Sequence, residues 1–204
     1  ENVNGNSQQN TINTPNLNLT NSTISAATAG IGNAGNIETL NTQNLTLNNS
    51  TISTAIAPTG ITTQPSNITL NTQQLNLTNN SQITASTEGK GNAGNITLPN
   101  AININLNQSE ITASTAGEGN TGEIELNSTN QIQLNNSDIN SSVEQNAVGN
   151  SQQISLNTPN LNLTNSTISA ATAGIGNAGN IETLNTQKLT LDNSIISTAI
   201  APTG

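Results

Sequence analysis

The stretch GNITLPNAININLNQSEITAS, residues 94–114, decides the fold of this chain. Apolar and polar residues alternate in three short segments, around Ile96/Leu98, Ile104/Leu106 and Ile111. A period of two puts apolar side chains on one face of a β-strand, whereas a helix would need a period of about 3.6. The stretch therefore predicts three short strands, joined by polar turns that are too short to hold helices.

The same unit recurs along the whole chain. A pair of the form L-x-L, I-x-L or similar returns every 28 to 30 residues, at Leu17/Leu19, Leu45/Leu47, Leu75/Leu77, Ile104/Leu106, Ile132/Leu134, Leu161/Leu163 and Leu189/Leu191. A longer repeat is superimposed, because residues 7–60 return as residues 151–204 with six substitutions, a period of 144 residues. Self-similarity of this kind indicates units that stack on one another.

We therefore expect an all-β fold, a parallel β-helix or β-solenoid of about seven coils, each with 28 to 30 residues and three short strands. Residues 1–204 are expected to form one uncapped solenoid segment of a longer repeat array. The apolar side chains of one coil contribute roughly 1.5 to 3 kcal/mol each on burial. Ordering the backbone costs about 1 to 2 kcal/mol per residue, so a coil is expected to need its neighbours.

An N-S-x-I element follows each apolar pair, with Gln in place of Asn in one unit. Its first residues fall in one column of the predicted stack, at Asn21, Asn49, Asn80, Gln108, Asn136, Asn165 and Asn193. Stacked amides can hydrogen-bond to one another along such a column. We expect these residues to form a structural ladder.

The spacing G-x-G-x-x-G occurs four times, beginning at Gly30, Gly89, Gly117 and Gly174. A dinucleotide-binding loop with this spacing follows a strand and opens a helix, whereas each copy here precedes another predicted strand. We interpret the motif as a turn, in which glycine supplies the positive φ that a tight corner needs. The corners are expected at the last glycine of each motif, namely Gly35, Gly94, Gly122 and Gly179.

Composition narrows the possible chemistry. The chain has no Cys, His, Met, Phe, Trp or Tyr, two basic residues, eleven acidic ones and a net charge of −9. Without a basic cluster, we expect no nucleic-acid partner, and without a long apolar run we expect no membrane insertion. The sequence offers no paired base and nucleophile, so no catalysis and no cofactor are expected. Lys90, which is basic, and Glu118, which is acidic, stand at equivalent positions of adjacent coils, so we expect them to form a weak ion pair.

One outward column, which contains Glu110 and Asp138, allows two other interpretations. Glu110 and Asp138 fall in one column, where two carboxylates could share a hard cation, but Ca²⁺ takes about 6 to 8 oxygens, and two solvated charges are the favoured interpretation. A flat face of threonines would suggest ice binding. The column before the third strand's Ile is interrupted by charges and reads Thr23, Thr51, Gln82, Glu110, Asp138, Thr167 and Ile195.

The segments ITASTEGKGNAGNITL, residues 83–98, and SEITASTAGEGNTGEIEL, residues 109–126, resemble the repeats of filamentous-haemagglutinin-like exoproteins, especially cyanobacterial ones secreted by the two-partner route. The resemblance extends over all seven units. It implies a right-handed β-helix in a secreted or cell-surface fibre that works in adhesion, aggregation or matrix formation, without a cofactor. The implied partners are neighbouring protomers end to end, and cell-surface or matrix glycans. The alternative is a binding module whose outer face recognises glycan or ice.

Overall fold

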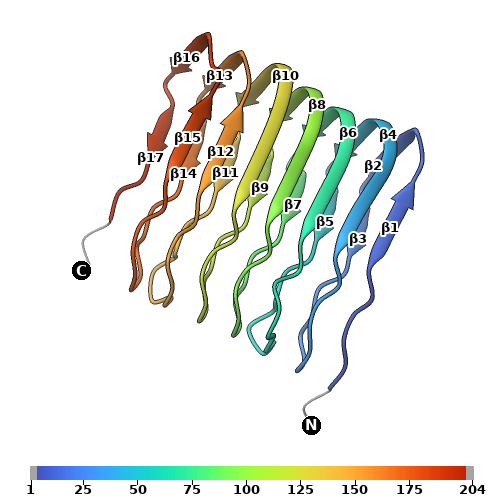
Figure 1. The fold of residues 1–204 in the computed structure, drawn as a ribbon, viewed down its shortest axis with the longest axis vertical. Coiled ribbons are helices and arrows are strands. Elements are labelled where there is room, and N and C mark those ends of the chain that lie inside the picture. The colour runs from blue at the N-terminus through green and yellow to red at the C-terminus, as the bar shows by residue number, and fades with distance from the viewer. Residues whose placement is uncertain (1–3, 201–204) are drawn as a thin grey trace.

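The computed structural model describes residues 4–200 and has the expected architecture: parallel strands wound into a stack of about seven coils (Figure 1). No helix occurs among these residues. Coils 1 to 7 begin at Asn10, Ile37, Ile68, Ile96, Ile124, Ile154 and Ile181. The all-β solenoid predicted from the sequence is confirmed.

The strands form two parallel sheets along opposite sides of the stack. The ten-stranded sheet contains β1 (Asn10–Asn13), β2 (Asn16–Thr20), β4 (Ile37–Asn48), β6 (Ile68–Thr78), β8 (Ile96–Asn107), β10 (Ile124–Asn135), β12 (Ile154–Asn157), β13 (Asn160–Thr164), β15 (Ile181–Leu184) and β16 (Lys188–Asp192). The seven-stranded sheet contains β3 (Thr23–Ser25), β5 (Thr51–Ser53), β7 (Gln82–Thr84), β9 (Glu110–Thr112), β11 (Asp138–Asn140), β14 (Thr167–Ser169) and β17 (Ile195–Ser197).

The expected three strands per coil differ from the observed pattern in coils 2 to 5. There the first two segments join into one bent strand of 11 or 12 residues, namely β4, β6, β8 or β10. In coils 1, 6 and 7 the two segments stay separate. In coils 1 and 6 a Thr-Pro pair, Thr14-Pro15 or Thr158-Pro159, stands between them and proline has no N–H for the sheet, whereas in coil 7 residues 185–187 separate β15 from β16 without a proline. Pro99 is tolerated inside β8 because the pairing with β10 shifts register just after Leu98.

The core consists of Ile and Leu columns that run through the stack. Register pairs Ile37 with Ile68, then Ile96 with Ile124, and all four side chains are fully buried. The hydrophobic cluster is continuous from coil 1 to coil 6. In coil 7, which has a described neighbour on one side only, Leu191 is 47% exposed. Burial of each apolar side chain thus depends on the adjacent coil, as a stack of mutually dependent units requires.

After the strand of the seven-stranded sheet, each coil continues into a further wall of the stack, where isolated parallel bridges and not strands join adjacent coils. One column of bridges includes Thr28, Ile56, Thr87, Thr115, Val143, Thr172 and Ile200. A second includes Ile31, Ile61, Lys90, Glu118, Val148 and Ile175. The glycine motifs lie in this wall, between the seven-stranded sheet and the start of the next coil.

Candidate functional site

Serine, the second residue of N-S-x-I, forms the main polar ladder between coils. The serine side chains of the interior coils are buried, and the column consists of Ser22, Ser50, Ser81, Ser109, Ser137, Ser166 and Ser194. At five of the six steps the backbone N–H of one serine donates to Oγ of the serine in the next coil, at 3.1 or 3.2 Å. Each hydroxyl in turn donates to a carbonyl two or three residues earlier in its own coil, so the serine hydroxyls are satisfied.

The amide residues directly before these serines do not form the continuous ladder that the sequence suggested. Among the described residues, their side chains join adjacent coils at two steps, from Asn49 to Asn21 at 2.8 Å and from Asn193 to Asn165 at 2.7 Å. All seven have positive φ between 48° and 61°, namely Asn21, Asn49, Asn80, Gln108, Asn136, Asn165 and Asn193. Asn accepts this left-handed conformation better than most residues, so the column makes the turn into the third strand.

Amide contacts between coils are instead found on the outer surface of the ten-stranded sheet. Asn44 Nδ2 donates to Asn16 Oδ1 at 2.8 Å, and Asn105 Nδ2 donates to Asn76 Oδ1 at 3.0 Å. Other asparagines cap backbone groups of the next coil. In the glycine-motif wall, the side-chain oxygens of Asn6, Asn33, Asn92, Asn120 and Asn150 each accept a backbone N–H one coil further on, at 2.8 to 3.0 Å. The Asn of G-x-G-N-x-G therefore serves coil stacking.

The glycine corners need a correction. Positive φ, from 125° to 149°, occurs at the second glycine of each motif, namely Gly32, Gly91, Gly119 and Gly176. It is not found at the last glycines, where the corners were expected from the sequence. Those residues are glycine because a Cβ would collide with the preceding coil: at Gly94 it would lie 1.8 Å from Ser66 O, and at Gly122 it would lie 1.8 Å from Gly94 O.

The last glycines also hold the two walls of one coil together. The N–H groups of Gly35, Gly94, Gly122 and Gly179 donate across the coil to the carbonyls of Ala26, Ala85, Ala113 and Ala170, at 2.7 to 3.0 Å. Coils 2 and 5 lack the motif, and hydroxyls make the link there. Thr54 Oγ1 donates to Ser66 O at 2.7 Å, and Ser151 Oγ donates to Ser141 O. Each glycine motif leads into a strand, and no described segment provides the helix of a dinucleotide site.

Lys90 and Glu118 lie opposite each other in the bridge column, and Lys90 Nζ is 3.0 Å from a Glu118 carboxylate oxygen. Both side chains are more than 60% exposed, at 61% and 63%. Solvent screens such a pair, whose contribution is about 0 to 1 kcal/mol. It therefore helps the alignment of two coils at most.

Glu110 and Asp138 are register partners in β9 and β11. Each carboxylate already accepts a hydrogen bond from the protein, Glu110 Oε1 from Asn140 Nδ2 at 3.1 Å and Asp138 Oδ1 from the Thr167 N–H at 3.0 Å. Loss of hydration raises the pKa of Glu144, and the charge of Glu110 adds to the increase, although the Glu144 residue as a whole is exposed. Across residues 4–200, no group of three or more acidic side chains is placed to hold a metal ion.

The residues of the possible ice-binding column lie in register on the outer face of the seven-stranded sheet. Pairing runs from Thr23 to Thr51, through Gln82, Glu110 and Asp138, to Thr167 and Ile195. The threonines are thus divided by one amide and two carboxylates, as the sequence indicated.

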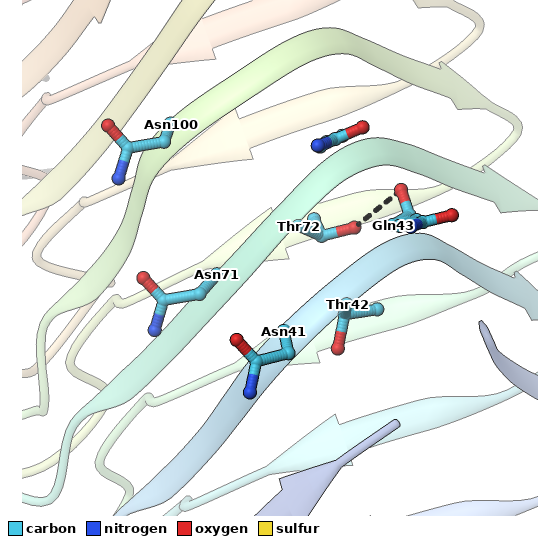
Figure 2. A pocket seen from close by; sticks show the side chains of 7 residues that line it. Asn41, Thr42, Gln43, Asn71, Thr72 and Asn100 are labelled. Atoms are coloured by element: carbon cyan, nitrogen blue, oxygen red, sulfur yellow. Dashed lines mark hydrogen bonds between the residues drawn. The ribbon is translucent and has the colours of Figure 1, made fainter. Parts of the chain in front are cut away.

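A surface hollow that was not expected from the sequence lies where β4, β6 and β8 bend (Figure 2). We call it the bend hollow; it has a volume of about 460 Å³ and is lined by Asn41, Thr42, Gln43, Asn71, Thr72, Gln73 and Asn100. The first signal for it in the sequence is the tripeptide N-T-Q at residues 41–43 and again at 71–73. Its location required the strand bend, which tertiary structure decides.

Comparison with known proteins provides no further assignment, since no family model, no curated protein and no solved structure matches the chain. Within residues 4–200, no helix has the length and hydrophobicity needed to cross a membrane.

Proposed function

We propose that this chain is a segment of the shaft of an extracellular fibre, which works in adhesion, aggregation or matrix formation and not in catalysis. The resemblance of residues 83–98 and 109–126 to filamentous-haemagglutinin-like repeats suggests this role. The observation that carries the proposal is the parallel pairing of each coil with the next through the whole stack, from Asn10 paired with Ile37 to Ile154 paired with Ile181. A structure built of one repeating contact suits a rod better than a reaction centre.

The polar residues of the chain support the same role. The serine column, the asparagine caps and the Gly-to-Ala links all join one coil to the next or close a coil on itself. Most of the polar chemistry inside the stack is thereby used for stacking. The described residues contain no three-membered group of metal-binding side chains, and the sequence contains no His, Cys or Tyr that would act as a base or nucleophile.

Stacking also relates chain length to rod length. Coils advance by about 4.8 Å, the spacing of neighbouring strands. The 144-residue repeat contains five coils, residues 10–153, and would lengthen a rod by about 24 Å. Fibre length is therefore adjustable by repeat number without a new interface.

Localisation tests this proposal directly. Antibodies raised against the folded segment are applied to intact and permeabilised cells of the organism that makes the protein, followed by immunogold electron microscopy. We expect labelling outside intact cells, distributed along filaments. Labelling confined to permeabilised cells would refute the proposal, as would extracellular labelling of compact particles alone.

A further inference from the structure

The bend hollow presents uncharged hydrogen-bonding groups in rows that follow the stack. Asn41, Asn71 and Asn100 project from β4, β6 and β8 in one row, as Figure 2 shows. Gln43 and Gln73 form a second row beside it. The strands that carry these rows are neighbours in one sheet, about 4.8 Å apart, and their pairing shifts register at this bend.

Several of these amides are free to bind a ligand. The side chains of Gln43, Gln73 and Asn100 make no hydrogen bond with any residue in the described part of the chain, and all three residues are exposed. Asn41 and Asn71 each use only their Nδ2, toward Asn13 Oδ1 at 3.1 Å and Thr39 O at 2.9 Å. Their side-chain oxygens stay available as acceptors.

At the floor of the bend hollow, the threonine side chains are buried and their hydroxyls are already hydrogen-bonded within the protein. Thr42 and Thr72 are each 3% exposed, and the Thr72 hydroxyl donates to Gln74 O at 3.0 Å. An apolar surface lies next to the amide rows, because Ile102 directly precedes Asn103, the partner of Gln74, and is 39% exposed. In the sequence, Ile102 precedes Asn103 as Gln73 precedes Gln74, the register partner of Asn103.

These features select the class of ligand. An amide offers a donor and an acceptor together, which matches the adjacent hydroxyls of a sugar. The lining has no ionisable side chain, and the net charge of −9 repels sulfated or carboxylated glycans. An extended chain of β-1,4-linked hexoses carries hydroxyls on both edges of every ring, so it can offer hydroxyls to the amides of successive coils, about 4.8 Å apart, even though neighbouring rings are flipped.

We propose that the bend hollow binds an uncharged, extended polysaccharide, whose chain lies along the stack across coils 2 to 4. The free amides of Gln43, Gln73 and Asn100 bind the hydroxyls, and Ile102 packs against the C–H face of a ring. The site does not depend on fibre formation, because a single copy of the chain contains it. Residues 185–187 repeat the N-T-Q of residues 41–43, and Asn185 has the same φ of 55° as Asn41.

Affinity electrophoresis of the whole chain tests this site. Native gels are cast with hydroxyethyl cellulose, mixed-linkage β-glucan, dextran or dextran sulfate. The groove variant combines Gln43→Ala, Gln73→Ala and Asn100→Ala, and leaves Asn41 in place because of its positive φ. The control variant removes three other exposed amides, by Asn18→Ala, Gln133→Ala and Gln145→Ala.

The proposal predicts retardation of the unaltered chain in at least one of the two β-glucan gels. Loss of three hydrogen bonds is expected to weaken binding about tenfold to hundredfold in the groove variant, whereas the control variant keeps the original mobility. Absence of retardation in both β-glucan gels would overturn the proposal. So would equal retardation of the groove variant, or stronger retardation by dextran sulfate. If the triple variant fails to fold, Gln73→Glu alone must weaken binding.

Discussion

The serine ladder makes a quantitative prediction at Ser137, the serine of coil 5. Its side chain is buried, with 2% exposed, and its Oγ accepts the Ser109 N–H at 3.1 Å. The same hydroxyl donates to Asn135 O at 2.8 Å, but that carbonyl also accepts the Gln108 N–H. Ser137→Ala therefore leaves one buried donor, the Ser109 N–H, without a partner.

An unsatisfied buried N–H costs about 1 to 3 kcal/mol. Ser194→Ala is the matched control, since Ser194 makes the same two bonds in coil 7 but lies where water can replace its hydroxyl. We expect it to cost less than about 0.5 kcal/mol. The two substitutions delete the same atom from the same repeat position, so burial is the variable that separates them.

Amide hydrogen exchange is the appropriate assay, because a stack of repeats does not have to unfold in one step. The Ser109 amide of the Ser137→Ala protein is expected to exchange about 5 to 150 times faster than in the unaltered chain. A lower urea midpoint should accompany the change. Equal, small effects of Ser137→Ala and Ser194→Ala would refute the view that the serine column satisfies buried backbone groups.

Three further substitutions test the backbone and the charges. Asn136→Gly should leave the urea midpoint unchanged, whereas Asn136→Ala should cost about 1 kcal/mol because φ is 48°; equal losses would favour an amide ladder. Gly122→Ala should cost about 1 to 3 kcal/mol or more, since its Cβ would lie 1.8 Å from a backbone oxygen, while Gly5→Ala, with open space around it, should be neutral in the same titration. Glu144 binds its proton more tightly in the folded chain, so folding loses stability as pH rises through and above the ordinary pKa of 4.5. Glu144→Gln should therefore raise the melting temperature at pH 7 but not at pH 4, and salt should reduce the gain by screening Glu110.

The amino-acid pattern was sufficient for the coil and its register. Alternation at Ile96/Leu98 and Ile104/Leu106 specifies which side of each strand is buried, since a shift by one residue would expose every apolar side chain. The recurrence of these pairs every 28 to 30 residues then places like residues above one another. The same spacing predicts that Lys90 lies next to Glu118 and Glu110 next to Asp138, and the observed strand register confirms both.

Contacts between coils were harder to predict. The motif N-S-x-I marked two polar residues, and the sequence offered no reason to assign the buried ladder to Ser137 and the turn to Asn136. The same holds for the glycines. The structure shows that residue 91 must be glycine because its φ is 125°. It also shows that residue 94 must be glycine because the backbone of the preceding coil leaves no space for a Cβ atom.

The sequence by itself thus determined the all-β stack, its repeat length and its apolar columns, because these follow from local alternation and equal spacing. The tertiary structure decided where the first two segments merge into β4, β6, β8 and β10, and where the resulting bend creates a hollow lined by Asn41, Gln43 and Asn100. The physical reason is that strand fusion, left-handed turns and close backbone approach depend on distances of a few ångströms between coils. Those distances are set by packing across the stack and not by the residues of one segment.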